Sequence, residues 1–177
     1  MLLIIKFYFK FEMSSLSICI PNYNRPESLD DCLNSIRIAK DNFSKLVFEV
    51  CISDNSSENG PLEIIKKYEK DFKIKFHKND KNLGFALNAI QTVKMASCKF
   101  AWLIGNDDLI LPNTFRDLYE IFDKNKDSEF FFVNSYYLNS EYLEKYSKPF
   151  DTHNLNLEKM DSICKKKINK KVNFWEI

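Results

Sequence analysis

Glycine is scarce in this chain, with only Gly60, Gly84 and Gly105 among 177 residues. No GxGxxG pattern follows an apolar run, and no GxxxxGK(S/T) pattern occurs. A Rossmann dehydrogenase and a P-loop NTPase each use one of these glycine-rich phosphate-binding turns, so the sequence excludes a P-loop NTPase and argues against a Rossmann dehydrogenase. A receiver-like domain would gather its acids around one phosphorylatable aspartate, and the acidic residues of this chain do not follow that pattern.

Other signals are also missing. The 26 basic and 25 acidic residues give a net charge of +1, so no overall field indicates a nucleic-acid partner. Five cysteines show no CxxC or Cys/His spacing, which predicts reduced core thiols in a cytoplasmic protein. The apolar residues 1–11 are interrupted by Lys6 and Lys10, are too short to span a bilayer, and lack a signal-peptide cleavage pattern. His77 and His153 are isolated and are interpreted as strand and loop residues.

The length suits one domain with a sizeable core. We divide the chain into an N-terminal extension at 1–13, a folded domain at 14–135 and a remainder at 136–177. The remainder holds five clustered lysines at 165–171, which favour a solvated helix or tail and leave a basic patch for anionic lipid as the alternative.

Within 14–135, strand and helix patterns alternate. Short apolar runs predict strands at 16–20, 46–52, 74–77, 100–104 and 130–133. Helical spacing lies between them, with Pro61 and Pro112 at two of the expected starts. The segment 85–96 is predicted as a helix with Ala86, Leu87, Ile90 and Val93 aligned on one apolar face. This alternation predicts an α/β fold with a mostly parallel sheet between helices, which places ligands at the carboxyl ends of the strands.

A polar cluster follows each of the first four predicted strands. The strongest is GNDD at 105–108, directly after the apolar run FAWLI. Adjacent carboxylates repel each other unless a positive group neutralises them, and Mg²⁺ or Mn²⁺ is the usual partner. The alternative is a solvated turn that opens the next helix, where aspartate favours the helix dipole.

Taken in order, these clusters resemble family 2 glycosyltransferases with the GT-A, Rossmann-like fold. The segments LSICIPNYNR at 16–25, CISDNSS at 51–57, NLGFALN at 82–88 and NDD at 106–108 resemble the opening strand, the nucleotide-binding acid turn, the asparagine-x-glycine segment and the metal-binding DXD element of that family. The resemblance covers roughly 16–133. It makes 14–135 a nucleotide-sugar-binding domain and 136–177 a partial acceptor-side region or tail.

The resemblance implies a transfer of sugar from a nucleoside diphosphate sugar, with a UDP-sugar expected, to a glycan or lipid-linked acceptor, with inversion and a divalent cation, Mn²⁺ or Mg²⁺. Asp107 and Asp108 would hold the cation, with Asp108 the stronger candidate. Asp54 would accept a hydrogen bond from the base, or instead cap a turn. Arg25 would reach the phosphates, or instead pair with a surface acid. The residues implied in donor nucleotide binding are Pro21, Tyr23, Asn24, Arg25, Asp54, Asn82, Gly84, Asn106 and Asp107.

Two positions depart from the family pattern, because Asn106 and Ser53 stand where relatives often carry aspartate. The chain is also short, and its catalytic base is unknown. Acids that lie in the right general region without a supporting motif are Glu141, Glu144, Asp151 and Asp161. The end FWEI at 174–177 resembles the beginning of an acceptor-side segment that is cut off. The alternative function is therefore a non-catalytic nucleotide-sugar-binding remnant. Either protein would be cytoplasmic, with peripheral contact at the inner membrane face where acceptors are lipid-linked.

Overall fold

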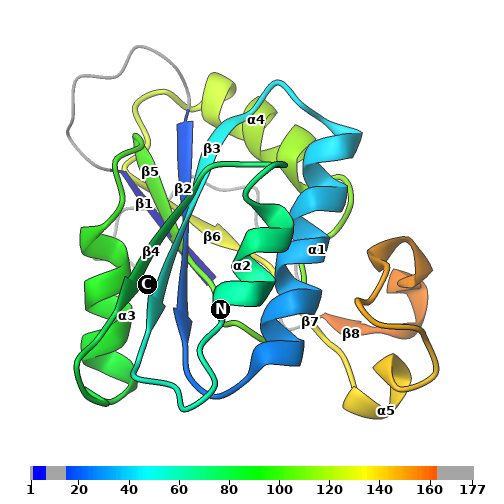
Figure 1. Ribbon diagram of the computed structural model, residues 1–177. Coiled ribbons are helices and arrows are strands. Elements are labelled where there is room, and N and C mark those ends of the chain that lie inside the picture. The colour runs from blue at the N-terminus through cyan, green and yellow to red at the C-terminus, as the bar shows by residue number, and fades with distance from the viewer. Residues whose placement is uncertain (1, 7–14, 163–177) are drawn as a thin grey trace.

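The computed structural model describes residues 2–6 and 15–162 (Figure 1). Its strands are β1 (Leu2–Lys6), β2 (Ser15–Asn22), β3 (Val47–Asp54), β4 (Ile74–Lys78), β5 (Phe100–Leu103), β6 (Phe130–Val133), β7 (Tyr136–Tyr137) and β8 (Asp161–Ser162). Its helices are α1 (Pro26–Asn42), α2 (Leu62–Tyr68), α3 (Phe85–Lys94), α4 (Thr114–Lys124), α5 (Ser140–Leu143) and the 3-10 turns η1 (Thr152–Asn154) and η2 (Leu157–Lys159).

Six strands form the main sheet in the order β4-β3-β2-β5-β1-β6. Strands β2, β3, β4 and β5 pair in parallel, and the chain returns between them through α1, α2 and α3. Parallel neighbours need such crossover connections, which is why helical and strand patterns alternate in the sequence. The predicted α/β fold with a mostly parallel sheet is confirmed.

Strand β1 differs from the expectation of an N-terminal extension outside the domain. It pairs antiparallel with both β5 and β6, so residues 2–6 separate these two strands inside the sheet. Ile4 lies opposite Trp102 on one side and Phe131 on the other, and it is fully buried. An apolar segment gains more from burial between two strands than from exposure to water, and this gain places residues 2–6 in the sheet.

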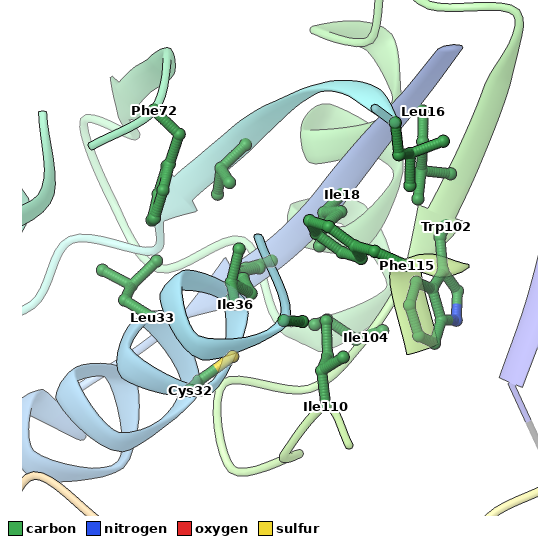
Figure 2. Close-up of a cluster of buried hydrophobic side chains, with 14 of the residues drawn as sticks. Leu16, Ile18, Cys32, Leu33, Ile36, Phe72, Trp102, Ile104, Ile110 and Phe115 are labelled. Atoms are coloured by element: carbon green, nitrogen blue, oxygen red, sulfur yellow. The ribbon is translucent and has the colours of Figure 1, made fainter. Parts of the chain in front are cut away.

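The two faces of the sheet are covered unequally. Alternate residues of the central strands, such as Leu16, Ile18 and Trp102, point to the face that α1, α2 and α4 cover, where the larger core lies. Figure 2 shows Cys32, Leu33 and Ile36 of α1 against these strand side chains. The opposite face is covered by α3, over a smaller cluster around Cys19, Cys51 and Ala101. Within the described residues, the cysteines Cys19, Cys32, Cys51 and Cys98 are free, as predicted.

Helix α3 forms where it was expected, but of the expected face only Val93 packs against the sheet, at the cluster around Cys19, Cys51 and Ala101. Leu87 and Ile90 are about half exposed, while Asn88, Ala89 and Thr92 are buried. The reason is that α3 lies over strand ends that carry polar groups. The side chain of Asn88 satisfies those groups, whereas a leucine there would leave them unpaired.

Residues 134–162, which follow β6, lie beside α1 (Figure 1). Phe150 is fully buried, and its backbone is held at both ends. Asp31 accepts a hydrogen bond from the Phe150 N–H at 2.7 Å, and Asn34 donates one to the Phe150 carbonyl at 2.8 Å. No helix in the described part of the chain is long and apolar enough to cross a bilayer. The lysine cluster at 165–171 and the segment 174–177 lie outside the described residues.

Candidate nucleotide-sugar site

The carboxyl ends of three neighbouring strands are aligned by the sheet register. Asn22 at the end of β2 pairs with Asp54 at the end of β3, and Asp54 pairs with Lys78 at the end of β4. The turn after β5 lies next to β2 on the other side, because Ile104 continues the ladder by donating to the Cys19 carbonyl at 3.0 Å. The four polar clusters predicted from the sequence therefore share one edge of the sheet.

Asp54 is at the centre of this edge and is fully buried. Its Oδ1 accepts hydrogen bonds from Asn22 Nδ2 at 2.8 Å and from Ser57 Oγ at 2.6 Å. Its Oδ2 accepts one from the Ser57 N–H at 3.0 Å. This is the geometry of a turn-capping aspartate, and it leaves acceptor capacity on Oδ2, since each carboxylate oxygen has two lone pairs.

Asn22 connects this carboxylate to the turn after β5. Its Nδ2 donates to Asp54, and its Oδ1 accepts from Asn106 Nδ2 at 2.8 Å. Both asparagines are buried, so the amide of Asn106 faces the interior of the edge rather than solvent. Buried amides of this kind fix their neighbours only when they are hydrogen-bonded. The hydrogen bonds that join Asp54, Asn22 and Asn106 therefore give the turn after β5 a rigid support.

A second group of amides fixes the start of α3. Asn55 donates to Asn82 Oδ1 at 2.7 Å and accepts from the Leu83 N–H at 2.8 Å. Asn88 accepts from Ser53 Oγ at 2.7 Å and from Asn79 Nδ2 at 2.9 Å. Gly84, with φ of 79°, adopts a left-handed conformation that other residues rarely take, and this lets the chain enter the helix directly after the asparagine turn.

The two adjacent carboxylates converge on one backbone position. Asp108 Oδ2 accepts a hydrogen bond from the Gly105 N–H at 2.7 Å. A Cβ atom added to Gly105 would lie 2.6 Å from Asp107 Oδ1 and 3.2 Å from Asp108 Oδ2, so any larger residue would push the Asp107 carboxylate away from its observed position. Burial raises the pKa of Asp108 above its usual value, the Gly105 hydrogen bond opposes that rise, and the negative charge of Asp107 adds to it.

Arg25 is the positive group at this turn. It precedes α1, and its Nη1 lies 2.6 Å from Asp107 Oδ2. Both side chains are more than half exposed, at 59% and 56%. Arg25 thus pairs with an acid, as the alternative interpretation expected. That acid, Asp107, is itself a predicted cation ligand.

A divalent cation fits these residues in part. The convergence of Asp107 and Asp108 on Gly105 provides a small set of hard oxygen donors, which Mg²⁺ and Mn²⁺ accept. Within residues 2–6 and 15–162, no group of three or more His, Cys, Asp or Glu side chains could hold a metal ion. The described residues would therefore supply two carboxylates to a cation, together with ligands such as phosphate and water.

The structure brings most of the predicted residues to this edge. Pro21 is buried there, Tyr23 is 43% exposed, and Asn24 links two turns by donating its N–H to Ser57 Oγ and accepting from the Glu58 N–H. The acids considered as a catalytic base have no contact at this edge among the interactions of the described residues. Asp151 pairs with His153, which contacts Asn42. Asn42 is the last residue of α1, whereas Arg25 precedes its first residue.

Sequence reasoning did not assign roles to several residues of the network. Those residues are Asn22, Ser53, Asn55, Ser57, Asn79 and Asn88. All but Asn79 stand inside the motifs that carried the family resemblance. Asn79 follows the third predicted strand, where only a turn was inferred. Asn88 carried no signal of burial, because it lies on the side of its helix opposite the predicted apolar face.

A model of "Glycosyl transferase family 2" matches residues 17–175. The chain belongs to this family. It is 36% identical over 114 residues to abequosyltransferase RfbV of Salmonella typhimurium (strain LT2), an alignment that covers 63% of this chain and 34% of RfbV. It is 29% identical over 114 residues to the poly(ribitol-phosphate) beta-N-acetylglucosaminyltransferase TarS of Staphylococcus aureus (strain Mu50), covering 64% of this chain and 20% of TarS. The chain thus spans about a third or less of these relatives.

Solved structures agree with the fold. The structure of S. aureus TarS residues 1–349 in complex with UDP superposes with a TM-score of 0.58 at 26% identity, covering 63% of this chain and 33% of that one. A mannosyltransferase of Pyrobaculum calidifontis in complex with GDP-Man and Mn²⁺ superposes with a TM-score of 0.52 at 15% identity, covering 62% of this chain and 32% of the other, and it supports the fold alone. The predicted GT-A fold of a family 2 glycosyltransferase is confirmed.

Proposed function

We propose that this chain is the donor-binding part of a glycosyltransferase that takes its sugar from a nucleoside diphosphate sugar, with a UDP-sugar as the expected donor. The observation that carries the proposal is the convergence of Asp107 and Asp108 on Gly105, at the same edge as the buried Asp54. Family membership supports it, as does the likeness to a TarS structure that holds UDP.

In this proposal, the nucleotide lies along the ends of β2 and β3. Tyr23 packs near the base. Asp54 is fully buried, so it accepts from the base N–H through the remaining capacity of Oδ2 only once the turn that covers it moves aside. Pro21 and Asn24 shape the turn beside it. Asn82 and Gly84 line the side nearer the sugar, and Asn106 supports the turn that carries the carboxylates.

The same proposal assigns a divalent cation to Asp107 and Asp108, shared with the donor diphosphate. When bound, such a cation offsets the negative charge that develops on the leaving diphosphate. The protein residues hold it at a fixed edge, since Asp108 is anchored to the Gly105 N–H. Asn106 carries no charge and donates its amide to Asn22, so we expect weaker cation binding than three carboxylates would give.

Transfer also requires a base that accepts the proton of the attacking acceptor hydroxyl. In-line attack at the anomeric carbon would break the bond to the diphosphate and invert the configuration there. The described residues offer no base with a supporting contact at this edge, so the base remains unassigned. The acceptor is proposed to be a glycan or a lipid-linked sugar, which would bring the protein to the inner face of the membrane.

A calorimetric titration of the chain with UDP, with and without Mn²⁺, tests the donor site. We expect Mn²⁺ to strengthen UDP binding at least about tenfold, since charge-assisted contacts to phosphate are worth more than about 1.4 kcal/mol. The variant Asp108→Asn keeps the size and an acceptor atom but removes the charge. It should lose most of the Mn²⁺ effect and change the unfolding midpoint little.

The exposed Asp123, which pairs with Lys126 on the surface, offers a matched control. Asp123→Asn removes the same charge and should leave the Mn²⁺ effect intact. Failure of the folded wild-type chain to bind UDP, GDP or TDP under any condition would overturn the proposal. Equal loss of Mn²⁺-dependent binding in both variants would show that Asp108 has no particular role.

A further inference from the structure

Arg25 and Asp107 join two segments that are 82 residues apart in the sequence. Arg25 stands immediately before α1, and Asp107 stands in the turn after β5. Their contact of 2.6 Å uses Asp107 Oδ2, an oxygen of one of the two carboxylates proposed to hold the cation. The structure thus places the positive guanidinium of Arg25 on Asp107 Oδ2, while Asp107 Oδ1 is the oxygen that lies near Gly105 together with Asp108.

The backbone beneath Arg25 is fixed, while its side chain has no role in the helix. The Arg25 carbonyl accepts the first helical hydrogen bond from the Leu29 N–H at 3.1 Å. The preceding Asn24, at φ of 49°, is tied to Ser57 and Glu58 through its N–H and side chain. Arg25 occupies the N-cap position but makes no side-chain capping bond. The guanidinium can therefore change partners without disturbing α1 or the turn.

The guanidinium and a divalent ion compete for the negative charge of Asp107. With the guanidinium on Asp107, the carboxylate pair attracts a divalent ion less strongly, and an ion bound at the pair would repel the guanidinium. The ion pair is solvent-exposed, and such pairs are weak, so it opens readily. It would lower the affinity for a free cation by up to about fivefold, which corresponds to about 1 kcal/mol.

We propose that Arg25 is a positioning residue that exchanges partners during donor binding. Without ligand it offsets the charge of Asp107; when a divalent cation binds Asp107, the guanidinium moves to the anionic diphosphate of the donor. This proposal rests on the proposed function. Guanidinium groups bind phosphate through two parallel hydrogen bonds, which gives the released side chain a strong new partner. Cation and nucleotide then strengthen each other's binding by the same factor.

The test measures Mn²⁺ affinity of the chain by the loss of the free-ion electron paramagnetic resonance signal, first without nucleotide. We expect Arg25→Gln to bind Mn²⁺ alone about three- to fivefold more tightly than the wild type. Because exposed charges are screened by salt, this difference should shrink between about 50 mM and 500 mM NaCl. The variant Arg25→Lys keeps the charge and should stay within about twofold of the wild type.

For UDP binding we expect the opposite ranking, with the wild type binding more tightly than Arg25→Gln. Arg25→Gln loses the phosphate contact, so we expect its affinity for UDP in the presence of Mn²⁺ to fall at least about tenfold. A control is Lys124→Gln, which removes one positive charge from an exposed pair with Glu120 and should change neither affinity. Thermal unfolding of each variant checks that the fold is retained.

Several results would overturn this exchange. Equal Mn²⁺ affinity of wild type and Arg25→Gln without nucleotide would do so, as would undetectable binding of Mn²⁺ to both. A gain that is independent of salt would also count against it. The titration with Mn²⁺ alone keeps this separate from the proposed function, because failure of every nucleotide to bind would overturn the function while leaving the competition for Asp107 measurable.

Discussion

At the scale of single residues, Glu49 is the buried charge with the most partners outside the site. Its carboxylate is 3% exposed and receives Lys75 at 3.0 Å, Lys73 at 3.1 Å and the Ser97 N–H at 2.9 Å. Burial by itself would raise the pKa of Glu49, but these hydrogen bonds outweigh it and lower the pKa from 4.5 to about 2. Glu49 thus ties β3, β4 and the segment before β5 together on the face that α3 covers.

This lowered pKa has a defined consequence for stability. A carboxylate with a lower pKa in the folded state stabilises that state above its unfolded pKa, and the contribution is lost as the pH falls from about 4.5 to 2. Glu49→Gln should cost about 3 kcal/mol of unfolding free energy at pH 7 and much less near pH 2.5. Urea unfolding across this pH range measures the gap. Glu120→Gln, in an exposed pair, should show no such gap, and a gap for Glu49→Gln that does not change with pH would contradict the assignment.

Residues of the site differ in how far the sequence alone could place them. The position of Asp107 and Asp108 at the sheet edge was predictable, because both directly follow an apolar run that is typical of a buried strand. Asn22 and Asn79 were not assigned, because an asparagine near a strand end predicts a turn as readily as a buried amide. Asn88 was not assigned, because it lies opposite the predicted apolar face of its helix. Which of these amides is buried depends on the sheet register, and that is set by pairing between distant segments.

At the scale of elements, the parallel strands and their helices followed from local patterns, whereas β1 did not. A short apolar segment at a chain end carries no signal for its partner, and its place between β5 and β6 results from long-range pairing. Helix α3 illustrates the same limit, since hydrophobic periodicity indicated a face with Leu87 and Ile90 that is about half exposed. Periodicity finds a helix, but it finds the buried face only where the surface beneath the helix is apolar.

The place of β1 in the sheet can be tested at Ile4, which is fully buried. We expect Ile4→Ala to lower the unfolding free energy by about 2–4 kcal/mol, because it removes buried methyl groups and leaves a cavity beside Trp102. Urea unfolding gives the value. Leu62→Ala, at a position that is 51% exposed, should cost well under about 1 kcal/mol. Equal small costs for both variants would mean that residues 2–6 lie outside the cooperative core, as the sequence alone suggested.

At the scale of the whole molecule, several strands and a helix together form the candidate site. Its side chains come from the ends of β2, β3 and β5 and from the start of α3, and hydrogen bonds such as Asn22 to Asp54 and Asn106 to Asn22 cross between them. Such a site exists only in the folded sheet, because unfolding separates Asn22 from Asn106, which are 84 residues apart. Donor binding and global folding should therefore be linked in one equilibrium.

This linkage gives a prediction for the chain as a unit. A ligand that binds only the folded state stabilises it by about 2.7 kcal/mol at a concentration of about 100 times its Kd. UDP with Mn²⁺ at that level should therefore raise the urea midpoint while leaving the slope of the transition unchanged. In the double variant Asp107→Asn/Asp108→Asn, the increment due to Mn²⁺ should vanish, while any stabilisation by UDP alone should persist. A Mn²⁺ increment that survives in the double variant would place the cation away from these carboxylates, and a changed slope would mean that the site region unfolds separately from the sheet.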